Sequence, residues 1–398
     1  MMITGTGRRL RVAHLDHSTE PGGAELALVR LLEHKDWDSV VILPRGRSLG
    51  VFSALVGGRT AVARCGPVQP AGASRPGSLR GVLVGGMRLA GAAVALVASG
   101  PFRAADVVHA NSTRSAVYGA MASRLLRKRF VVQVRDTVDP DVMGRVGFAF
   151  YSRLVLPSAD AVIANSRATL TTAAPYVRPD ADVRVIPSPI GVMRVEEASM
   201  REGVRRVGMV ARIAPWKGQD VLLRAFAEAF AGSEVQLRLI GGTSFDSAAY
   251  LHGLERLARE LGIEQQVLFT GHRENVVEEI GELDICVHAS TRAEPLGQNV
   301  LQYLALGKAT IVADAGGPAE WVTDGINGLL SSPGDVAGLT SALRRLAGDP
   351  ALRARLGIGA LETPGLLDDA EISRRHGDAF RRVAARQHWR CGTTGSSG

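Results

Sequence analysis

Short apolar runs alternate with longer amphipathic segments along almost the whole chain. Runs rich in Val, Ile and Leu, such as residues 10–15, 39–43 and 106–109, have the length of buried strands. Segments with apolar residues three and four positions apart, such as 26–34 and 221–230, have the spacing of helices that pack one face on a sheet. This alternation predicts an α/β fold built on parallel sheets.

Residues 188–203 interrupt the alternation. They contain prolines, a glycine and charges of both signs, and a new apolar run begins at residue 204. A chain of 398 residues is also longer than one compact core usually is. We therefore expect two doubly wound, Rossmann-like domains, spanning residues 1–190 and 200–370. The end of the chain, residues 391–398, is of low complexity and is expected to be disordered.

The most specific chemistry lies in residues 292–307. A predicted strand at 283–288 leads into this stretch, Pro295 and Gly297 bend the chain, and residues 300–306 follow helical spacing. This order of strand, turn and helix directs unpaired amides beyond the end of the strand, where the helix dipole favours an anion. The amides belong to Gly297, Gln298 and Asn299.

Three charged side chains complement this anion site. Glu294 directly precedes it and is better placed to accept hydrogen bonds from hydroxyl groups than to bind phosphate. Arg212 and Lys217 follow another predicted strand, 204–210, and could flank a diphosphate, the arginine bidentately and the lysine as a point charge. Phosphate on one side and hydroxyl groups on the other describe a sugar nucleotide.

The segment Glu294 to Gly297, the helix after it and the segment Gly307 to Glu320 resemble the donor-binding block of the family 4 glycosyltransferases. The resemblance implies the GT-B fold, in which two Rossmann-like domains face an interdomain cleft. It also implies retaining transfer, typically of a hexose, from a UDP- or GDP-sugar to a hydroxyl acceptor, without a metal ion or another cofactor. The acceptor, a natural-product or glycan precursor, is expected on the N-terminal domain. Enzymes of this fold often send their last helix back across the hinge, so we expect the helix of residues 371–390 to return to the N-terminal domain.

The resemblance also assigns roles to individual residues. Gly22 and Gly23 correspond to an N-terminal glycine loop that lets the ligand approach the backbone, and the turn containing Gly271 and Arg273 would meet the nucleobase. Independently of the resemblance, Arg135 lies at the carboxyl end of the predicted strand 130–136, where open α/β sheets bind ligands, and would either face the acceptor or pair with its neighbour Asp136. The complete expected site consists of catalytic Glu294, Arg212 and Lys217, and of substrate-binding Gly22, Gly23, Asn111, Arg135, Gly271, Arg273, Gly297, Gln298, Asn299 and Gln302.

Two positions depart from the family pattern. The pattern has a second glutamate eight residues after the first, where this chain has Gln302, and a second histidine where it has Asn111. A neutral amide accepts with one oxygen only, so we expect weaker donor binding or an altered donor preference at Gln302. Two alternatives stay open: a nucleotide-sugar-binding protein with a degenerate active site, and a sugar-nucleotide epimerase of GT-B fold.

The composition limits the classes of binding partner that are expected. The formal charge of +8 favours anionic ligands or surfaces, and the aromatic content of 5% without basic runs argues against nucleic acid. Three scattered cysteines fit a reduced, cytoplasmic location and no metal site. The apolar segment 82–102 is interrupted by Arg88, and its uncharged part, residues 89–102, is too short to span a bilayer. We therefore expect a buried helix, with peripheral membrane contact as the less favoured option. The sequence does not indicate an oligomeric state.

Overall fold

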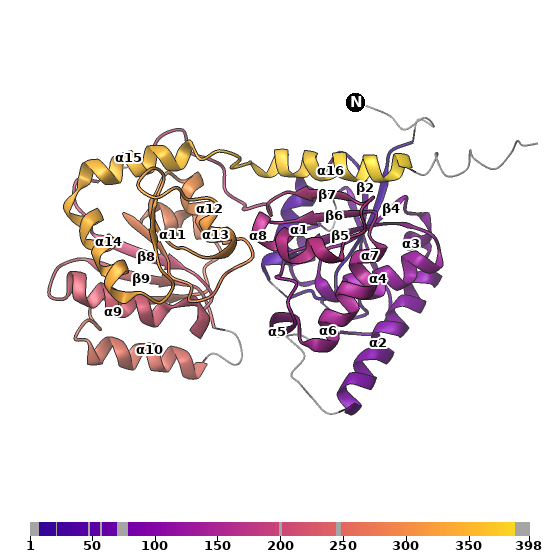
Figure 1. The fold of residues 1–398 in the computed structure, drawn as a ribbon, viewed down its shortest axis with the longest axis horizontal. Coiled ribbons are helices and arrows are strands. Elements are labelled where there is room, and N and C mark those ends of the chain that lie inside the picture. The colour runs from indigo at the N-terminus through magenta and orange to yellow at the C-terminus, as the bar shows by residue number, and fades with distance from the viewer. Residues whose placement is uncertain are drawn as a thin grey trace, which may run out of the picture. The chain divides into compact units, whose positions relative to one another are not determined.

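The computed structural model describes residues 8–386 except 21, 47, 56–57, 70–78, 199–200 and 244–247. The chain divides into two compact units. The N-terminal unit consists of Met1–Gly191 together with Asp369–Gly398, and the C-terminal unit consists of Val192–Asp368. Each unit contains one sheet flanked by helices (Figure 1). The tail 391–398, for which we expect disorder, lies outside the described residues.

The sheet of the N-terminal unit has seven parallel strands in the order β3-β2-β1-β4-β5-β6-β7. Its strands are β1 (Arg11–Leu15), β2 (Asp38–Leu43), β3 (Thr60–Arg64), β4 (Val107–Ala110), β5 (Arg129–Val134), β6 (Ala161–Ala164) and β7 (Asp182–Val185). Its helical segments are α1 (Gly23–Glu33), η1 (Gly50–Leu55), α2 (Leu79–Ala98), α3 (Gly100–Ala104), α4 (Thr113–Leu125), α5 (Pro140–Met143), α6 (Arg145–Phe150), η2 (Tyr151–Val155), α7 (Leu156–Ser158), α8 (Arg167–Ala173), η3 (Ala174–Tyr176) and α16 (Asp369–Ala385).

The sheet of the C-terminal unit has six parallel strands in the order β10-β9-β8-β11-β12-β13. Its strands are β8 (Arg206–Val210), β9 (Gln236–Ile240), β10 (Val267–Gly271), β11 (Ile285–His288), β12 (Ala309–Ala313) and β13 (Leu329–Ser331). Its helical segments are η4 (Pro215–Lys217), α9 (Gln219–Phe230), α10 (Ala248–Glu260), α11 (Val276–Gly281), α12 (Gln298–Ala305), α13 (Gly316–Ala319), α14 (Val336–Gly348) and α15 (Pro350–Leu361).

The strands at the centre of both sheets are buried on both faces. Every residue of β4, β6, β11 and β12 is buried, which explains why these strands read as continuous apolar runs. The strand order reverses between β1 and β4 in the first sheet and between β8 and β11 in the second. In doubly wound sheets, ligands bind beyond the carboxyl ends of the strands at these reversals. The topology prediction of two Rossmann-like sheets is confirmed.

Helix α16 packs on the N-terminal unit, to which its residues belong. His376 Nε2 lies 3.1 Å from Gln133 Oε1, and Ser373 Oγ donates to the carbonyl of Leu31 at 3.0 Å. Phe380 is buried, with ring centroids of Trp37 and His109 5.3 Å away. Burial lowers the pKa of His376 to about 4, so this histidine is neutral and contributes packing and hydrogen bonds.

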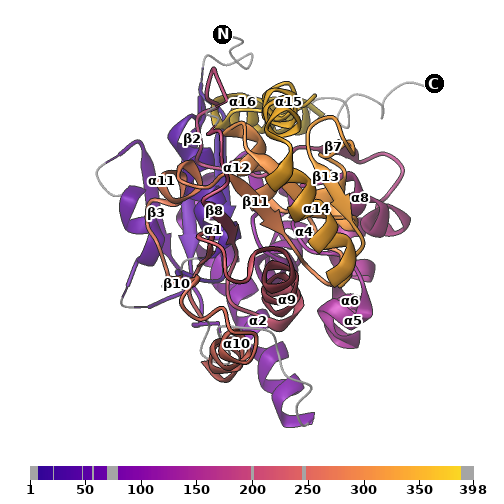
Figure 2. The same cartoon turned by 90° about the vertical axis from the view of Figure 1, so that its left-hand side faces the viewer.

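Helix α2 corrects the expectation of a buried helix. Ala92, Ala93 and Leu96 are buried, whereas Leu83, Met87 and other apolar side chains of α2 are exposed. The first half of α2 projects beyond the rest of the N-terminal unit (Figures 1 and 2). Among the helices in the described part of the chain, none combines the length and the apolar character needed to cross a bilayer. The prediction failed because apolar spacing does not reveal whether a second apolar face has a partner.

Candidate functional site

Polar side chains gather at the carboxyl ends of the central strands in both units. In the C-terminal unit they follow β8 and β11, and in the N-terminal unit they follow β1, β4 and β5. These strands flank the point where each strand order reverses. The fold therefore places two candidate sites, one per unit, at the positions where doubly wound sheets bind ligands.

The carboxylate of Glu294 is the centre of the C-terminal site. It is buried and accepts hydrogen bonds from Lys217 Nζ, 2.7 Å from both of its oxygens. Its Oε1 also lies 2.9 Å from His288 Nε2 and accepts a hydrogen bond from Ser290 Oγ. Lys217 follows β8, and His288 ends β11, so this carboxylate joins the ends of the two central strands.

Glu294 stays ionised in this setting. Burial alone would raise the pKa of its carboxyl, but the hydrogen bond with His288 and the charge of Lys217 outweigh burial and hold the pKa well below its usual range. A buried carboxylate with several donors is a rigid anchor because each donor has a fixed partner. Lys217 consequently has a defined position at the end of β8, although 14% of its side chain remains exposed.

Backbone contacts fix the segments that carry Lys217 and Glu294. Gly218 has a positive φ of 74°, and a Cβ there would lie 2.0 Å from the carbonyl oxygen of Ala289. Thr291 N donates to the carbonyl of Trp216 at 2.9 Å, and Gly317 N donates to the carbonyl of Glu294 at 2.8 Å. The turn after β8 and the loop after β11 are therefore held against each other by main-chain contacts as well as by the ion pair.

Helix α12 begins where the anion site is expected. Gly297 is its N-cap with a φ of 72°, and the helix starts at Gln298. The side chain of Asn299 donates to the carbonyl of Val210 at 3.0 Å and so ties the helix start to the end of β8. This side chain therefore has a structural role, and a ligand would use the main chain at this position. Gln302, one turn further, is buried.

The other residues expected in the C-terminal site differ in their partners. Arg212 is exposed, and among the described residues its guanidinium has no hydrogen-bond or ion-pair partner; its carbonyl accepts from Gln219 Nε2 at 3.0 Å. Gly271 ends β10 with a φ of 68°. Arg273 Nε lies 3.2 Å from Glu279 Oε1, so its charge is paired within the unit. Arg212 thus presents an uncompensated cation, whereas Arg273 does not.

Asp16 is the centre of the N-terminal site. This fully buried carboxylate accepts from Asn111 Nδ2 at 2.6 Å through Oδ2, and from Ser112 Oγ at 3.1 Å through Oδ1. Arg135 Nη2 donates to Asn111 Oδ1 at 2.7 Å, and Arg135 Nη1 donates to Ser188 Oγ at 2.6 Å. Asn111 and Arg135 are therefore in direct contact. The guanidinium of Arg135 pairs with these groups, and Asp136 accepts from Thr113 instead.

Glu25 brings a second buried carboxyl group to Asp16. It lies in the first turn of α1, which begins at Gly23 with Gly22 as its N-cap. Burial and the neighbouring charge of Asp16 raise the pKa of Glu25 to about 7. A group with this pKa can donate or accept a proton near neutral pH.

Asp16, Glu25 and His17 bring possible ligand atoms within 4.8 Å of one another. His17 Nδ1 also lies 2.8 Å from Ser112 Oγ. Oδ1 of Asp16 accepts from the main-chain N–H of His17 and from Ser112 Oγ, and Oδ2 accepts from Asn111 Nδ2. Groups that both donate and accept suit the hydroxyl group of a ligand.

The sequence patterns missed several of these residues. Asp16 and His17 follow the first strand directly, His288 is the last residue of β11 and Ser290 comes just after it, so position at a strand end was an available signal. Glu25 lies two residues after the glycine pair, and neither spacing nor composition indicates that its carboxyl group is buried.

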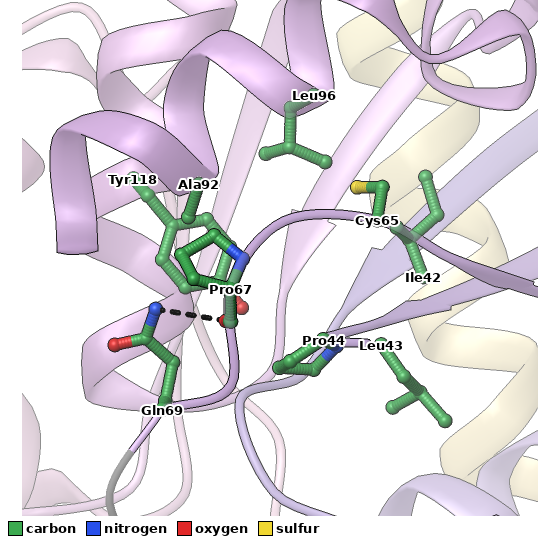
Figure 3. A pocket seen from close by; sticks show the side chains of 9 residues that line it. All are labelled: Ile42, Leu43, Pro44, Cys65, Pro67, Gln69, Ala92, Leu96 and Tyr118. Atoms are coloured by element: carbon green, nitrogen blue, oxygen red, sulfur yellow. Dashed lines mark hydrogen bonds between the residues drawn. The ribbon is translucent and has the colours of Figure 1, made fainter. Parts of the chain in front are cut away.

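A separate small cavity lies between α2, α4 and the ends of β2 and β3 (Figure 3). Its lining includes Cys65, Ala92, Leu96 and Tyr118, and its volume is about 10 Å³. This is room for about one water molecule, so the cavity cannot hold a sugar. Tyr118 supports the N-terminal site through the main chain, because its hydroxyl group donates a hydrogen bond to the carbonyl of Asp16 at 2.9 Å.

Two protein-family models match the chain. The model described as "Glycosyltransferase Family 4" matches residues 25–194, and the model "Glycosyl transferases group 1" matches residues 196–363. The first match lies in the N-terminal unit apart from its last residues, and the second lies in the C-terminal unit. Together the two models cover both candidate sites except Asp16, His17, Gly22 and Gly23.

Curated relatives match over part of their length. The chain is 35% identical over 182 residues to the lipopolysaccharide core biosynthesis glycosyltransferase LpsD of Rhizobium meliloti, covering 46% of this chain and 50% of that protein. It is 32% identical over 218 residues to the D-inositol 3-phosphate glycosyltransferase of a Nocardioides species, covering 49% and 47%. The chain thus spans about half the length of the curated relatives it matches.

Solved structures match over nearly the whole chain. HepE of Anabaena in complex with UDP superimposes with a TM-score of 0.78 at 25% identity, covering 94% of this chain and 100% of that chain. The complex of the same protein with UDP-glucose gives a TM-score of 0.76. Sucrose-phosphate synthase of Thermosynechococcus elongatus shares the fold, with a TM-score of 0.76 at 19% identity, covering 95% and 100%.

The raised pKa of Glu25 predicts a pH-dependent stability. The pKa of Glu25 is higher in the folded protein than its ordinary value of 4.5. Its contribution to the free energy of unfolding is therefore fully present below about pH 4.5 and is lost as the pH rises through about 7. Glu25→Gln cannot titrate, so wild-type protein should lose roughly 3 kcal/mol of unfolding free energy relative to this variant between about pH 4.5 and about pH 8.

Denaturant unfolding at a series of pH values measures this difference. Glu33→Gln on the exposed side of α1 is the matched control and should leave the profile unchanged. Parallel pH profiles for wild type and Glu25→Gln would show that the Glu25 carboxyl does not titrate near neutrality.

Proposed function

Since the chain belongs to the family 4 glycosyltransferases of GT-B fold, we propose that it transfers a sugar from a UDP-sugar to a hydroxyl group of an acceptor. The C-terminal unit holds the donor, and the N-terminal unit holds the acceptor. UDP is proposed as the nucleotide because HepE, 25% identical over most of this chain, has been solved with UDP and with UDP-glucose.

The contact between Lys217 and Glu294, with Arg212 beside it, is the observation that carries this proposal. In the transfer, the bond between the anomeric carbon and the terminal phosphate oxygen breaks, and negative charge collects on the UDP diphosphate. Two cations at the end of β8 stabilise that charge as it develops, which is the main way such a step is accelerated. No metal ion has a part in this scheme.

Glu294 has two tasks in the proposed mechanism. Its carboxylate holds the ammonium group of Lys217 in place, so the lysine need not move when negative charge develops on the UDP leaving group. Its Oε2 accepts one protein hydrogen bond, against three at Oε1, and so has capacity for a sugar hydroxyl group. The acceptor oxygen forms the new bond to the anomeric carbon, and its proton passes to the departing phosphate. Retention of the anomeric configuration is part of the proposal on the strength of the family.

The N-terminal site suits an acceptor rich in hydroxyl groups. Asp16, Asn111 and Arg135 form a connected polar network, and Glu25 adds a carboxyl group that titrates near neutrality. The curated relatives are named for lipopolysaccharide core biosynthesis and for D-inositol 3-phosphate. We propose a saccharide or cyclitol acceptor, as in the assembly of a glycan or a glycosylated natural product.

A nucleotide-sugar-binding protein without transfer activity is the second candidate, favoured by the two departures from the family pattern, Asn111 and Gln302. Gln302 stands where the family pattern has a glutamate, and a neutral amide interacts less strongly with two ribose hydroxyl groups. The intact Lys217–Glu294 pair favours the transferase. Slow release of UDP from UDP-sugars in the absence of acceptor distinguishes the two, since a binding protein returns its ligand unchanged.

Arg212→Ala should separate catalysis from folding. The guanidinium has no described protein partner, so its loss should leave the melting temperature within about 2 °C, because exposed substitutions change stability little. It should lower kcat/KM for UDP release from the preferred UDP-hexose by about 100-fold, the usual cost of one group that stabilises the leaving charge.

Arg224→Ala, also exposed in the C-terminal unit, is the matched control and should retain full activity. Equal activity of Arg212→Ala and Arg224→Ala would remove Arg212 from the mechanism. No UDP release by wild type from any member of a UDP-hexose panel, despite measurable binding, would support the binding protein.

Gln302→Glu should tighten donor binding. A carboxylate can accept from both ribose hydroxyl groups, and hydrogen bonds to charged groups exceed neutral ones by about 1 kcal/mol, so the Kd for UDP should fall about five- to tenfold. Isothermal titration with UDP measures the change. Gln236→Glu, on an exposed position of β9, is the control. An unchanged Kd in a variant that melts like wild type would place Gln302 outside the ribose contact.

A further inference from the structure

Helix α2 has two apolar faces, and within the described part of the chain only one of them has a partner. Its buried face packs on α4 through residues such as Ala92 and Leu96. On the opposite face Leu83, Met87 and Val94 are 64%, 66% and 69% exposed. Spacings of four and seven residues place these three side chains in one stripe along the helix. A group of large apolar side chains exposed side by side is typical of an interaction surface.

Further exposed apolar side chains lie at the same end of the N-terminal unit. Val142 on α5 and Val146 and Phe150 on α6 are 61%, 49% and 43% exposed. Helix α6 continues into η2, which packs on α4, and α4 packs on α2. Figures 1 and 2 both show α2, α5 and α6 at one end of the unit. The apolar side chains therefore belong to one helical layer.

The charged side chains on the helices of this layer are positive, with one exception. Helices α2, α3, α4, α6 and η2 contain arginines, and neither they nor α7 contain an aspartate or glutamate; Asp141 on α5 is the exception. The exposed arginines of these helices are Arg88, Arg103, Arg124, Arg145 and Arg153. Apolar side chains interspersed with cations are the composition of a surface that lies in the boundary between lipid headgroups and acyl chains.

The two units also differ in net charge, and the unit with the basic helices is the positive one. Residues 192–368 carry 17 Lys and Arg against 23 Asp and Glu, whereas the rest of the chain carries 30 against 16. The excess of positive charge thus lies on the unit that has the exposed stripe. This asymmetry decides between occupants: a second copy of the chain would bring two basic layers together, and repulsion between like charges opposes that contact. An anionic bilayer attracts the arginines and accepts the apolar side chains.

We propose that the layer formed by α2, α3, α4, α5, α6, η2 and α7 binds the surface of an anionic lipid bilayer. Leu83, Met87 and Val94, with Val146 and Phe150, enter the headgroup boundary, and the arginines contact lipid phosphates. The chain attaches to one leaflet without crossing it. None of these residues belongs to the candidate sites, so the proposal is independent of the transfer activity and can fail or succeed separately from it.

Sedimentation of the full chain with vesicles tests the proposal. Wild-type protein should bind vesicles of phosphatidylcholine with 30% phosphatidylglycerol at least tenfold more tightly than vesicles of phosphatidylcholine alone, and raising the salt from about 0.1 M to about 0.5 M should remove most of this preference. The double variant Leu83→Glu and Met87→Glu should lower binding more than tenfold, because it places two carboxylates in the apolar boundary.

Ile326→Glu, 62% exposed in the C-terminal unit, is the matched control and should bind like wild type. The variant Arg88→Gln with Arg145→Gln gives an independent reading that keeps the apolar stripe, and it should weaken binding to anionic vesicles several-fold without changing the melting temperature. Equal binding of wild type and the Leu83→Glu, Met87→Glu variant, or no preference for anionic vesicles, would overturn the proposal. A dimer in solution that this variant dissociates, without vesicle binding by wild type, would assign the stripe to a second copy instead.

Discussion

A buried carboxylate must find donors, and the way Glu294 satisfies this requirement organises the C-terminal unit. Its donors come from the turn after β8, from the last residue of β11 and from the loop that follows β11. One carboxylate thereby joins the two strands between which the sheet order reverses. Removing one member of such a group leaves an uncompensated buried charge and typically costs about 3–5 kcal/mol. The constraint that stabilises the unit is therefore the same one that positions Lys217.

The N-terminal unit meets the requirement differently. Asp16 is buried at the corresponding strand reversal, but its donors are the amide of Asn111, a hydroxyl group and two main-chain N–H groups, and Arg135 reaches it only through Asn111. Among the described residues no Lys or Arg contacts Asp16 directly, and burial together with the charge of Asp16 raises the pKa of Glu25. The two sites thus provide a cation next to an ionised carboxylate in one unit and a carboxyl group that titrates near neutral pH in the other.

The sequence predicted most of the fold because strands buried on both faces appear as continuous apolar runs. It pointed to Glu294, Lys217 and Arg212 as candidates because they lie on strand-to-helix turns and match the family pattern, although nothing in the sequence shows that Lys217 and Glu294 are in contact across 77 positions. Asp16 and Glu25 were missed because one acid at a strand end has no distinguishing pattern. The buried helix expected at residues 82–102 was wrong for a related reason: apolar spacing predicts a face but not its partner.

A structure of the protein with UDP-glucose bound tests the central claim most directly, namely that the Lys217–Glu294 pair is the charged centre of a donor site. The account predicts the terminal phosphate of UDP within about 3 Å of Lys217 Nζ, with the guanidinium of Arg212 on the same diphosphate and the contact between Lys217 and Glu294 retained. A diphosphate bound away from the carboxyl ends of β8 and β11, with Lys217 and Arg212 unengaged, would contradict it.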